Sequence, residues 1–569
     1  MLEGFSVTAG LSLIMSKTTT LLSILLLPSV LLAQPANTPP RAAIASAHPL
    51  ATQAGMAVLQ QGGNAFDAAV AVAATLGVVE PYSSGIGGGS FWLLYDAKKQ
   101  KSVMIDAREA APLSASEDMY LDKQGNVDRD RSINGPLAAG IPGQPAALAW
   151  VTQHYGQLQL KTNLAAAIGH ARNGFPMNPV YERMLGARKD ILHRYPASAD
   201  LWQPVTAKGK PALIQQTQLA STLTVLANRG HQGFYTGSLA KTMVSNINAD
   251  GGQWSLQDLA NYQVIEREPI VISYRDATIT SAAPPSSGGL VLAEIFNMLE
   301  ATQYQHNNNP EQIAILVEAM RRAYFDRARY MGDPDFVSMP TAQLTSKDYA
   351  AQWAQSITPN QATPSSDLGL LTDGTSGSHT THFSVLDKAG NRVSVTASIN
   401  LPFGSGYTIP GTGVLLNDEM DDFSAKPGEP NAYGLVGSEA NAIAPGKRPL
   451  SSMSPSFVET DGAVAILGTP GGSRIITMVL LGSLTMLNNQ PVEDWVSTPR
   501  YHHQYLPDTI QYEPGALSPE QIKALRKMGY SVKDLGRQYG NMQAVLWDKA
   551  NNTVSAASDP RGIGTVQLQ

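Results

Sequence analysis

The residue best placed for covalent chemistry in this chain is a threonine that follows a loop-like segment. Residues 356–378 are rich in Thr, Pro, Ser, Gly and Asp, which predicts an exposed, mobile loop. Thr380-Thr381-His382 comes directly after it. A cut before Thr380 gives this residue a free α-amine with an ordinary pKa of about 7.7–8.0, which can take the proton from its own hydroxyl. One residue then supplies both nucleophile and base; the alternative is a structural Thr-Thr pair at a strand start.

The composition excludes several other chemistries. The 569 residues include no cysteine, so disulfides, cysteine metal sites, a thiol nucleophile and a lipoprotein anchor are excluded. A hydrophobic share of 43% with 15% charged residues does not fit a disordered chain, and a net charge of −6 without a basic run argues against a nucleic-acid binder. The ten histidines form no His-Glu-x-x-His, and His502 and His503, as neighbours on a strand, would point to opposite faces. We therefore expect no metal and no other cofactor.

Two further motifs are better explained as structure. Ser238-Leu239-Ala240-Lys241 fits the Ser-x-x-Lys of penicillin-recognising enzymes, but no Ser-Asp-Asn or Lys-Thr-Gly follows, so we expect a helix N-terminus. Gly85–Gly89 lacks the spacing of a dinucleotide-binding loop.

Helices that could support the threonine follow from periodicity. A helix over Pro49–Gln61 is expected to end at Gly62-Gly63, and Asn64 to cap a second helix over Ala65–Val79. This second helix is apolar nearly all round and should be buried. A third helix over Glu311–Arg329 has apolar residues at helical spacing on one face and charges on another.

Strand patterns surround the threonine. Thr380–Asp387 and Arg392–Ile399 alternate polar and apolar residues on either side of the turn Lys388–Asn391, which predicts a β-hairpin. Phe91–Tyr95 and Ser102–Asp106 are predicted as two further strands.

The N-terminus has the layout of a signal peptide. Lys17 precedes a Thr-rich stretch and the apolar run Leu21–Ala33, which is shorter than the roughly 20 residues that span a bilayer. We therefore expect residues 1–33 to be removed, a possible natural start at Met15, and export to a periplasm or the medium. A buried N-terminal helix is the alternative.

Seven short segments form a further pattern. In chain order they are Gly85–Gly89, Asp106–Glu109, Pro284–Gly289, Thr380–Val385, Leu415–Phe423, Pro449–Pro455 and Gly468–Arg474. Together they resemble the motifs of γ-glutamyltransferases, also called γ-glutamyltranspeptidases or glutathione hydrolases. The resemblance covers the chain from about Ala42 to the C-terminus.

The resemblance implies an α+β fold of the N-terminal nucleophile hydrolase type, a four-layer αββα sandwich with two stacked antiparallel sheets. It also implies that a zymogen cleaves itself between His379 and Thr380. A large subunit over residues 34–379 and a small subunit over residues 380–569 would then stay associated as a heterodimer.

The resemblance also assigns the reacting groups. Thr380 Oγ1 would attack the γ-carbonyl of glutathione or another γ-glutamyl donor, and the acyl group would pass to an amino acid, a dipeptide or water. Backbone N–H groups of Gly471 and Gly472 are suited to stabilise the oxyanion. Ser398 stands where the family commonly has a threonine that supports the nucleophile, so the methyl group that restricts the rotamer is missing.

Two sets of residues are expected to bind the zwitterionic end of the donor. The guanidinium of Arg108 offers a bidentate fork to the α-carboxylate, helped by the hydroxyls of Ser451 and Ser452. The acceptors expected for the α-ammonium are Asn400, Glu419 and Asp422.

Residues 427–447, which include Tyr433, resemble the lid loop that covers the pocket in many bacterial members. An ordinary surface loop is the alternative for this Pro- and Gly-rich run.

Two alternative functions stay open. A cephalosporin-type amide acylase on the same scaffold accepts donors without the α-amine and tends to lose the acid at Asp422. An exported binding protein for γ-glutamyl peptides would have lost catalysis. Retention of Thr380, Arg108, Asp422 and Gly471-Gly472 favours the active γ-glutamyl enzyme.

Overall fold

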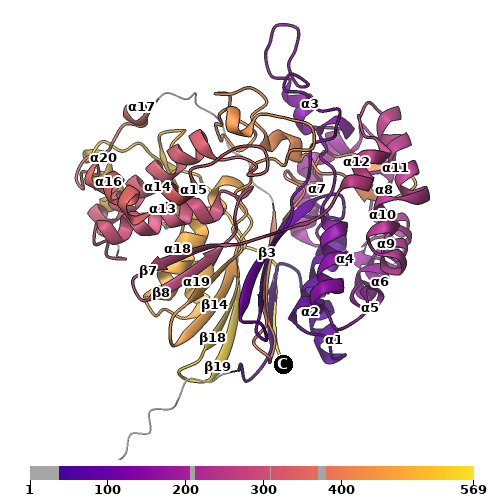
Figure 1. The fold of residues 1–569 in the computed structure, drawn as a ribbon, viewed down its shortest axis with the longest axis horizontal. Helices are drawn as coiled ribbons and strands as arrows, with labels where there is room; N and C mark the ends of the chain where they lie inside the picture. The colour runs from indigo at the N-terminus through magenta and orange to yellow at the C-terminus, as the bar shows by residue number, and fades with distance from the viewer. Residues whose placement is uncertain (1–37, 206–211, 308, 370–379) are drawn as a thin grey trace, which may run out of the picture. The chain divides into compact units, whose positions relative to one another are not determined.

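Two antiparallel β-sheets lie face to face in the computed structural model (Figure 1). The structure describes residues 38–205, 212–307, 309–369 and 380–569. The expected signal peptide over residues 1–33, with Met15, and the expected cleavage residue His379 lie outside the described residues.

The first sheet has seven strands and contains the segment that begins after Thr380. Its spatial order is β20 (Thr565–Leu568), β1 (Ala43–Ser46), β9 (Thr381–Leu386), β10 (Arg392–Ser398), β2 (Gly89–Asp96), β3 (Lys101–Ala107) and β6 (Ile265–Arg267). The predicted hairpin is confirmed as β9 and β10, which pair antiparallel, and the two other predicted strands are β2 and β3.

The second sheet has six strands, and an apolar layer joins it to the first. Its order is β19 (Thr553–Ser558), β18 (Gln543–Asp548), β14 (Ala463–Gly468), β13 (Ser456–Glu459), β8 (Ala277–Ser281) and β7 (Ile270–Tyr274). Leu93 and Leu386 of the first sheet pack with Phe457, Ile466 and Val545 of the second in one buried cluster.

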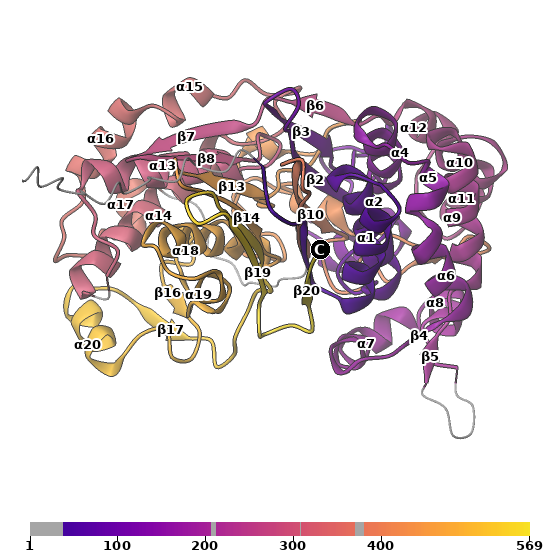
Figure 2. The same cartoon turned by 90° about the horizontal axis from the view of Figure 1, so that it is seen from below.

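Helices cover the outer face of each sheet (Figure 2). The main helices on the side of the first sheet are α1 (Pro49–Gln60), α2 (Ala65–Val79), α4 (Gln144–Tyr155), α6 (Ala165–Asn173), α7 (Pro179–Leu192), α9 (Thr217–Arg229) and α11 (Gly237–Ala249). On the side of the second sheet they are α13 (Gly288–Ala301), α14 (Pro310–Tyr330), α16 (Lys347–Gln355), α18 (Ile475–Leu487) and α19 (Val492–Ser497). The four-layer αββα arrangement is therefore confirmed.

The predicted helices are confirmed with small differences. Helix α1 ends at Gln60, one residue earlier than predicted, and α2 has the predicted bounds. Asn64 caps α2 by accepting from the N–H groups of Phe66 and Asp67, and every residue of the helix is buried. The Ser238–Lys241 motif lies in the first turns of α11, as expected for a helix N-terminus.

Helix α14 is more deeply buried than its pattern indicates. A charged helix face ordinarily meets solvent, but Glu318, Arg322 and Arg327 on this helix are all buried. Protein groups from other segments satisfy them: the hydroxyl and the carbonyl of Ser356, for example, both accept from the guanidinium of Arg322.

The segment after α16 is also more ordered than predicted. Within the expected loop over residues 356–378, Ser365–Leu368 forms the short helix α17. Ser365 is buried, and its hydroxyl is satisfied there because it accepts from Arg321 and donates to the carbonyl of Tyr505. The prediction of a loop is therefore wrong for this turn, although Ser366 and Asp367 within it are exposed as predicted, and residues 370–379 lie outside the described residues.

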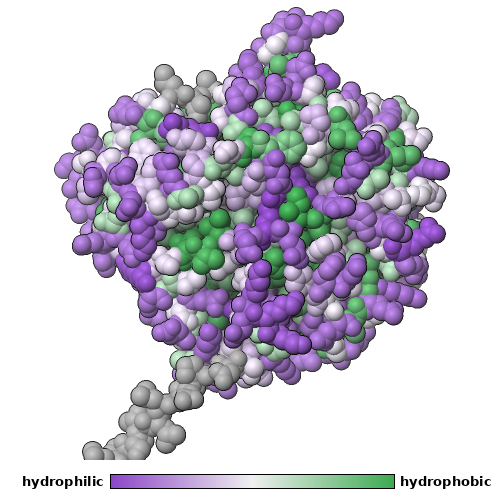
Figure 3. All heavy atoms as spheres, in the orientation of Figure 1, coloured by the Kyte–Doolittle hydropathy of each residue, from purple (hydrophilic) through white to green (hydrophobic). Residues whose placement is uncertain are grey.

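Polar side chains cover most of the face drawn in Figure 3, with smaller apolar groups between them. Within the described ranges, no helix is long and apolar enough to cross a membrane.

Candidate active site

Thr380 directly precedes β9 of the first sheet. Thr381 pairs with Ala397 of β10, and extension of this register by one residue places Ser398 opposite Thr380. Side chains alternate along a strand, so Thr380 points to the same side as Ser384. The Ser384 hydroxyl donates to the carbonyl of Gln543 in the second sheet (3.1 Å), which identifies that side as the inner one.

Thr380 lines two cavities. We call the first the Arg108 cavity, and it gathers ten of the eleven residues expected to bind or react: Arg108, Thr380, Ser398, Asn400, Glu419, Asp422, Tyr433, Ser451, Ser452 and Gly472. Gly471 does not line it but directly precedes Gly472. The two glycines have φ angles of 155° and 57°, values that residues with a Cβ rarely adopt, and the helical turn Gly472–Arg474 follows. The predicted set is therefore brought together.

Arg108 forms the centre of this cavity. Its side chain is 1% exposed, and its two terminal nitrogens donate to the carboxylates of Glu419 and Asp422. Nε donates to the carbonyl of Pro449 (3.1 Å). Because these groups close on one another, a volume of only about 20 Å³ remains, close to that of one water. The terminal nitrogens of Arg108 are therefore already bonded to Glu419 and Asp422 within this cavity.

Burial changes the ionisation of these acids. It raises the pKa of Glu419 to about 7, although the charge of Arg108 opposes the shift. Burial also raises the pKa of Asp422, and that of Glu109 well above its ordinary value. At neutral pH the cluster consequently carries less negative charge than its three carboxyl groups allow.

The segment expected to be a lid covers the cavity from one side. Tyr433 is 4% exposed, and its hydroxyl donates to the carbonyl of Asn400 (2.9 Å). Asn431 Nδ2 donates to Asp422 Oδ1 (3.1 Å). Both contacts join residues of this segment to Asn400 and Asp422, two of the residues expected to accept the ammonium.

Hydrogen bonds to the backbone hold the segment that contains Ser451 and Ser452. The Ser287 hydroxyl donates to the carbonyl of Ser451 (2.8 Å), and the Ser286 hydroxyl donates to the carbonyl of Met453 (2.7 Å). The expected family segment Pro284–Gly289 therefore acts as a support for the two serines.

Arg327 also lines the Arg108 cavity, and sequence reasoning missed it. It lies on α14 among other charged residues, so nothing in its local pattern separates it from a solvated charge. Only the fold identifies Arg327 as a cavity residue, because its side of α14 faces the Arg108 cavity.

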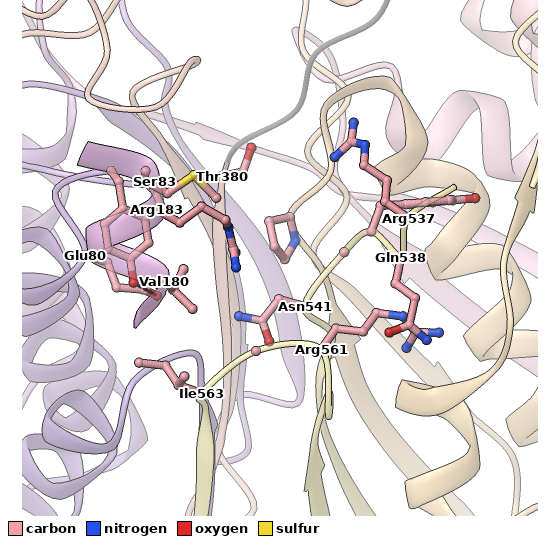
Figure 4. A pocket seen from close by; sticks show the side chains of 16 residues that line it. Glu80, Ser83, Val180, Arg183, Thr380, Arg537, Gln538, Asn541, Arg561 and Ile563 are labelled. Atoms are coloured by element: carbon pink, nitrogen blue, oxygen red, sulfur yellow. Dashed lines mark hydrogen bonds between the residues drawn. The ribbon is translucent and has the colours of Figure 1, made fainter. Parts of the chain in front are cut away.

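The second cavity, which we call the Glu80 cavity, has a volume of about 470 Å³ (Figure 4). Glu80, at the C-terminal end of α2, is buried and accepts from Thr381 Oγ1 (2.7 Å) and from the hydroxyl of Tyr82 (3.3 Å). Burial raises the pKa of Glu80 to about 7. Arg183 and Arg561 line opposite walls of the same cavity (Figure 4), and the guanidinium of Arg561 pairs with Glu513 and Asp559. Sequence reasoning also missed this cavity, since its residues come from distant segments.

The two adjacent histidines are structural. His502 Nδ1 lies 2.9 Å from the hydroxyl of Thr477, and its Nε2 lies 2.8 Å from Oε1 of Gln504. His503 Nε2 lies 3.2 Å from Asp508. Within the part of the chain that the structure describes, no group of three or more His, Asp or Glu side chains could hold a metal ion.

Comparison with known proteins gives one consistent family. The γ-glutamyltranspeptidase family model matches residues 51–568. A glutathione hydrolase proenzyme of Escherichia coli (strain K12) is 40% identical over 528 residues, covering 91% of this chain and 90% of its own. One from Pseudomonas sp. (strain A14) is 41% identical, with 91% and 92% covered. The crystal structure of a cephalosporin acylase from Bacillus halodurans aligns with a TM-score of 0.81 at 27% identity, covering 93% of this chain and 96% of that one.

Proposed function

The chain belongs to the γ-glutamyltranspeptidase family, and from this membership we propose that it cleaves the γ-glutamyl amide bond of glutathione and related compounds through an acyl-enzyme on Thr380. The γ-glutamyl group then passes to an amino acid, a dipeptide or water. The observation that carries the proposal is that Thr380 shares one buried cavity with Arg108, Glu419 and Asp422.

Before the first turnover, water hydrolyses the peptide bond between His379 and Thr380, which leaves a carboxylate on His379 and a free α-amine on Thr380. The freed α-amine takes the proton of Thr380 Oγ1 while this oxygen attacks the γ-carbonyl carbon of the donor. The tetrahedral oxyanion is stabilised by backbone N–H groups of Gly471 and Gly472. When the C–N bond of the donor breaks, the α-amine of Thr380 returns its proton to the leaving nitrogen. In the second half of the reaction an acceptor amine or water gives a proton to this α-amine and attacks the acyl carbon. Thr380 Oγ1 then leaves and takes the proton back. Ser398, opposite Thr380, supports the nucleophile's hydroxyl.

When the donor binds, its α-carboxylate and α-ammonium replace the ion pairs of Arg108 with Glu419 and Asp422. The α-carboxylate binds Arg108, Ser451 and Ser452, and the α-ammonium binds the acids released from Arg108 together with Asn400. Since Asp422 is one of the two acids paired with Arg108, a donor without the α-amine leaves a buried acid without its cation. This favours γ-glutamyl donors over the acyl groups of a cephalosporin-type acylase.

Processing and export complete the proposal. Removal of residues 1–33 and the cut before Thr380 leave a large subunit over 34–379 and a small one over 380–569, which remain a heterodimer outside the cytoplasm. The lid around Tyr433 excludes water from the acyl-enzyme and so affects the ratio of transfer to hydrolysis.

Intact mass measurement of the wild type beside Thr380→Ala and Thr380→Ser tests this proposal. We expect two wild-type chains, the smaller beginning at Thr380, an uncut Ala variant, and a Ser variant that still cleaves because it keeps a hydroxyl. An uncut wild-type chain would refute the mechanism and favour a binding protein for γ-glutamyl peptides.

A donor assay on the cleaved protein separates the two enzymatic alternatives. We expect turnover of L-γ-glutamyl-p-nitroanilide and little turnover of glutaryl-p-nitroanilide, which lacks the α-amine. Preference for the glutaryl donor would instead indicate an acylase.

A further inference from the structure

Arg327 is a buried cation that lines the Arg108 cavity, and the proposed mechanism gives it no role. Its side chain projects from α14 and the residue is 4% exposed. Nε donates to Ser287 Oγ (2.9 Å), and Nη2 donates to Ser452 Oγ (3.2 Å). The guanidinium thus connects the segment that supports the two serines with one of the serines themselves.

Arg327 differs from most buried arginines of this protein in having no carboxylate partner. Among the residues that the structure describes, no acid forms an ion pair with it. The buried arginines that do pair with an acid are Arg108, Arg321, Arg322, Arg392, Arg448 and Arg500. Burial lowers the pKa of Arg327 to about 10, so it keeps its charge at neutral pH. A buried cation without an anion is costly unless a ligand supplies the anion.

The charge of the whole cavity points the same way. Arg108 and Arg327 contribute two positive charges. Burial raises the pKa of Glu419 to about 7 and that of Glu109 well above its ordinary value, so these acids are not fully ionised at neutral pH. Asp422, the third acid of the cavity, is bonded to Arg108 rather than to Arg327. Among the described residues Arg327 therefore has no ion-pair partner of its own on the side of Ser452, and a ligand carboxylate can balance its charge.

The hydrogen bonds of the two serines define where such a carboxylate binds. A hydroxyl has one proton to donate and accepts through its oxygen. Ser452 Oγ accepts from Arg327, and Ser451 Oγ accepts from the backbone N–H of Met453 (3.2 Å). Within the described residues, neither hydroxyl donates to a protein acceptor. Both protons are therefore available to an anion in the cavity.

We propose that Arg327 is a specificity-determining residue for the donor's α-carboxylate: by donating to Ser452 Oγ it leaves the Ser452 O–H for the carboxylate, and its charge balances that anion. Arg327 is a positioning residue in this arrangement, since it acts through Ser452 beside the direct fork of Arg108. The inference rests on the proposed γ-glutamyl function and adds a residue to its donor site.

Paired donors test this inference. L-γ-glutamyl-p-nitroanilide carries the α-carboxylate, and its α-carboxamide analogue has the same leaving group without that charge. For Arg327→Gln we expect KM for the carboxylate donor to rise about 10- to 100-fold, the loss typical of a charge-assisted hydrogen bond. We expect kcat to stay within about threefold, and kcat/KM for the carboxamide donor to change little, so the preference for the carboxylate donor collapses.

Two further variants keep the result interpretable. Arg329→Gln removes a charge from an exposed position two residues along α14 and should leave both donors unchanged. Arg327→Lys keeps the charge but cannot reach both serines from one planar group, so it should retain part of the preference. If Arg327→Gln fails to fold or to cleave itself, Arg327→Lys still tests the inference. The inference then requires that this variant lose activity selectively on the carboxylate donor.

Equal losses on both donors, or no loss on either, would overturn the inference and leave Arg327 a purely structural residue. Failure of the proposed function has a different signature, since the wild type itself would not turn over the carboxylate donor.

Discussion

Replacement of Glu80 by glutamine should make the protein more stable at neutral and alkaline pH and leave it unchanged in acid. Glu80 is fully buried at the end of α2 and receives hydrogen bonds from Thr381 and Tyr82. Glutamine has nearly the same shape, and its carbonyl oxygen can accept from Thr381. The substitution therefore removes the ionisable proton and little else.

The size of the effect follows from the pKa of Glu80. Burial raises it from the ordinary 4.5 to about 7. A carboxyl whose pKa is higher in the folded protein stabilises the fold fully below pH 4.5 and loses that contribution as the pH rises through about 7. At about 1.36 kcal/mol per pKa unit, the difference between these two pKa values corresponds to about 3 kcal/mol in the free energy of unfolding. With an unfolding entropy of about 2.1 cal/mol/K per residue, this free energy shifts the Tm of a chain of this length by about 3 °C.

Thermal unfolding of the cleaved wild type and of Glu80→Gln between pH 4.5 and 8.5 measures this effect. We expect equal Tm values near pH 4.5 and a Tm about 3 °C higher for the variant at pH 8, with most of the divergence between pH 5 and 7. A constant difference across this range, or a wild type more stable than the variant at pH 8, would refute the assignment of a buried, proton-bearing Glu80.

Two further substitutions test the surroundings of the nucleophile. Gly468→Ala would place a methyl group 2.3 Å from Cε1 of the buried His382 ring on β9, and we expect a loss of about 1–3 kcal/mol in unfolding free energy. Gly482→Ala, where the methyl group would meet the flexible end of Met542 at 2.9 Å and Cδ1 of Leu467 at 3.3 Å, serves as the control, and an equal loss in both variants would contradict this explanation. Ser398→Thr restores the methyl group that restricts the rotamer opposite Thr380, and we expect faster self-cleavage in a time course on denaturing gels; slower cleavage would contradict the supporting role.

The sequence predicted those elements whose causes are local. Helix α2 has a capping Asn64 and an apolar composition on every face, and the β9–β10 hairpin has alternation on both sides of a turn. The burial of the charged face of α14 was not predictable in this way. It depends on partners such as Ser356 and Ser365, which lie far along the chain and show no pattern of their own.

The same distinction holds for the candidate site. Arg108, Glu419 and Asp422 belong to segments whose order along the chain matches a family, so they could be grouped from the sequence. Glu80 and Arg327 are single charged residues at a helix end and within a helix, and each is adjacent to the site only because of how its helix packs. Charges of this kind are usually solvated, and only the fold identifies the exceptions.

The strand order of the two sheets determines how the proposed subunits stay together. β1 lies between β20 and β9, so a strand of the large subunit is hydrogen-bonded on both edges to strands of the small one. In the second sheet β8 of the large subunit pairs with β13 of the small one. The subunits therefore have no interface that can open while each keeps its shape, and their separation is itself unfolding. Dilution should not dissociate such a pair, and no exchange of subunits between molecules is expected while the sheets are intact.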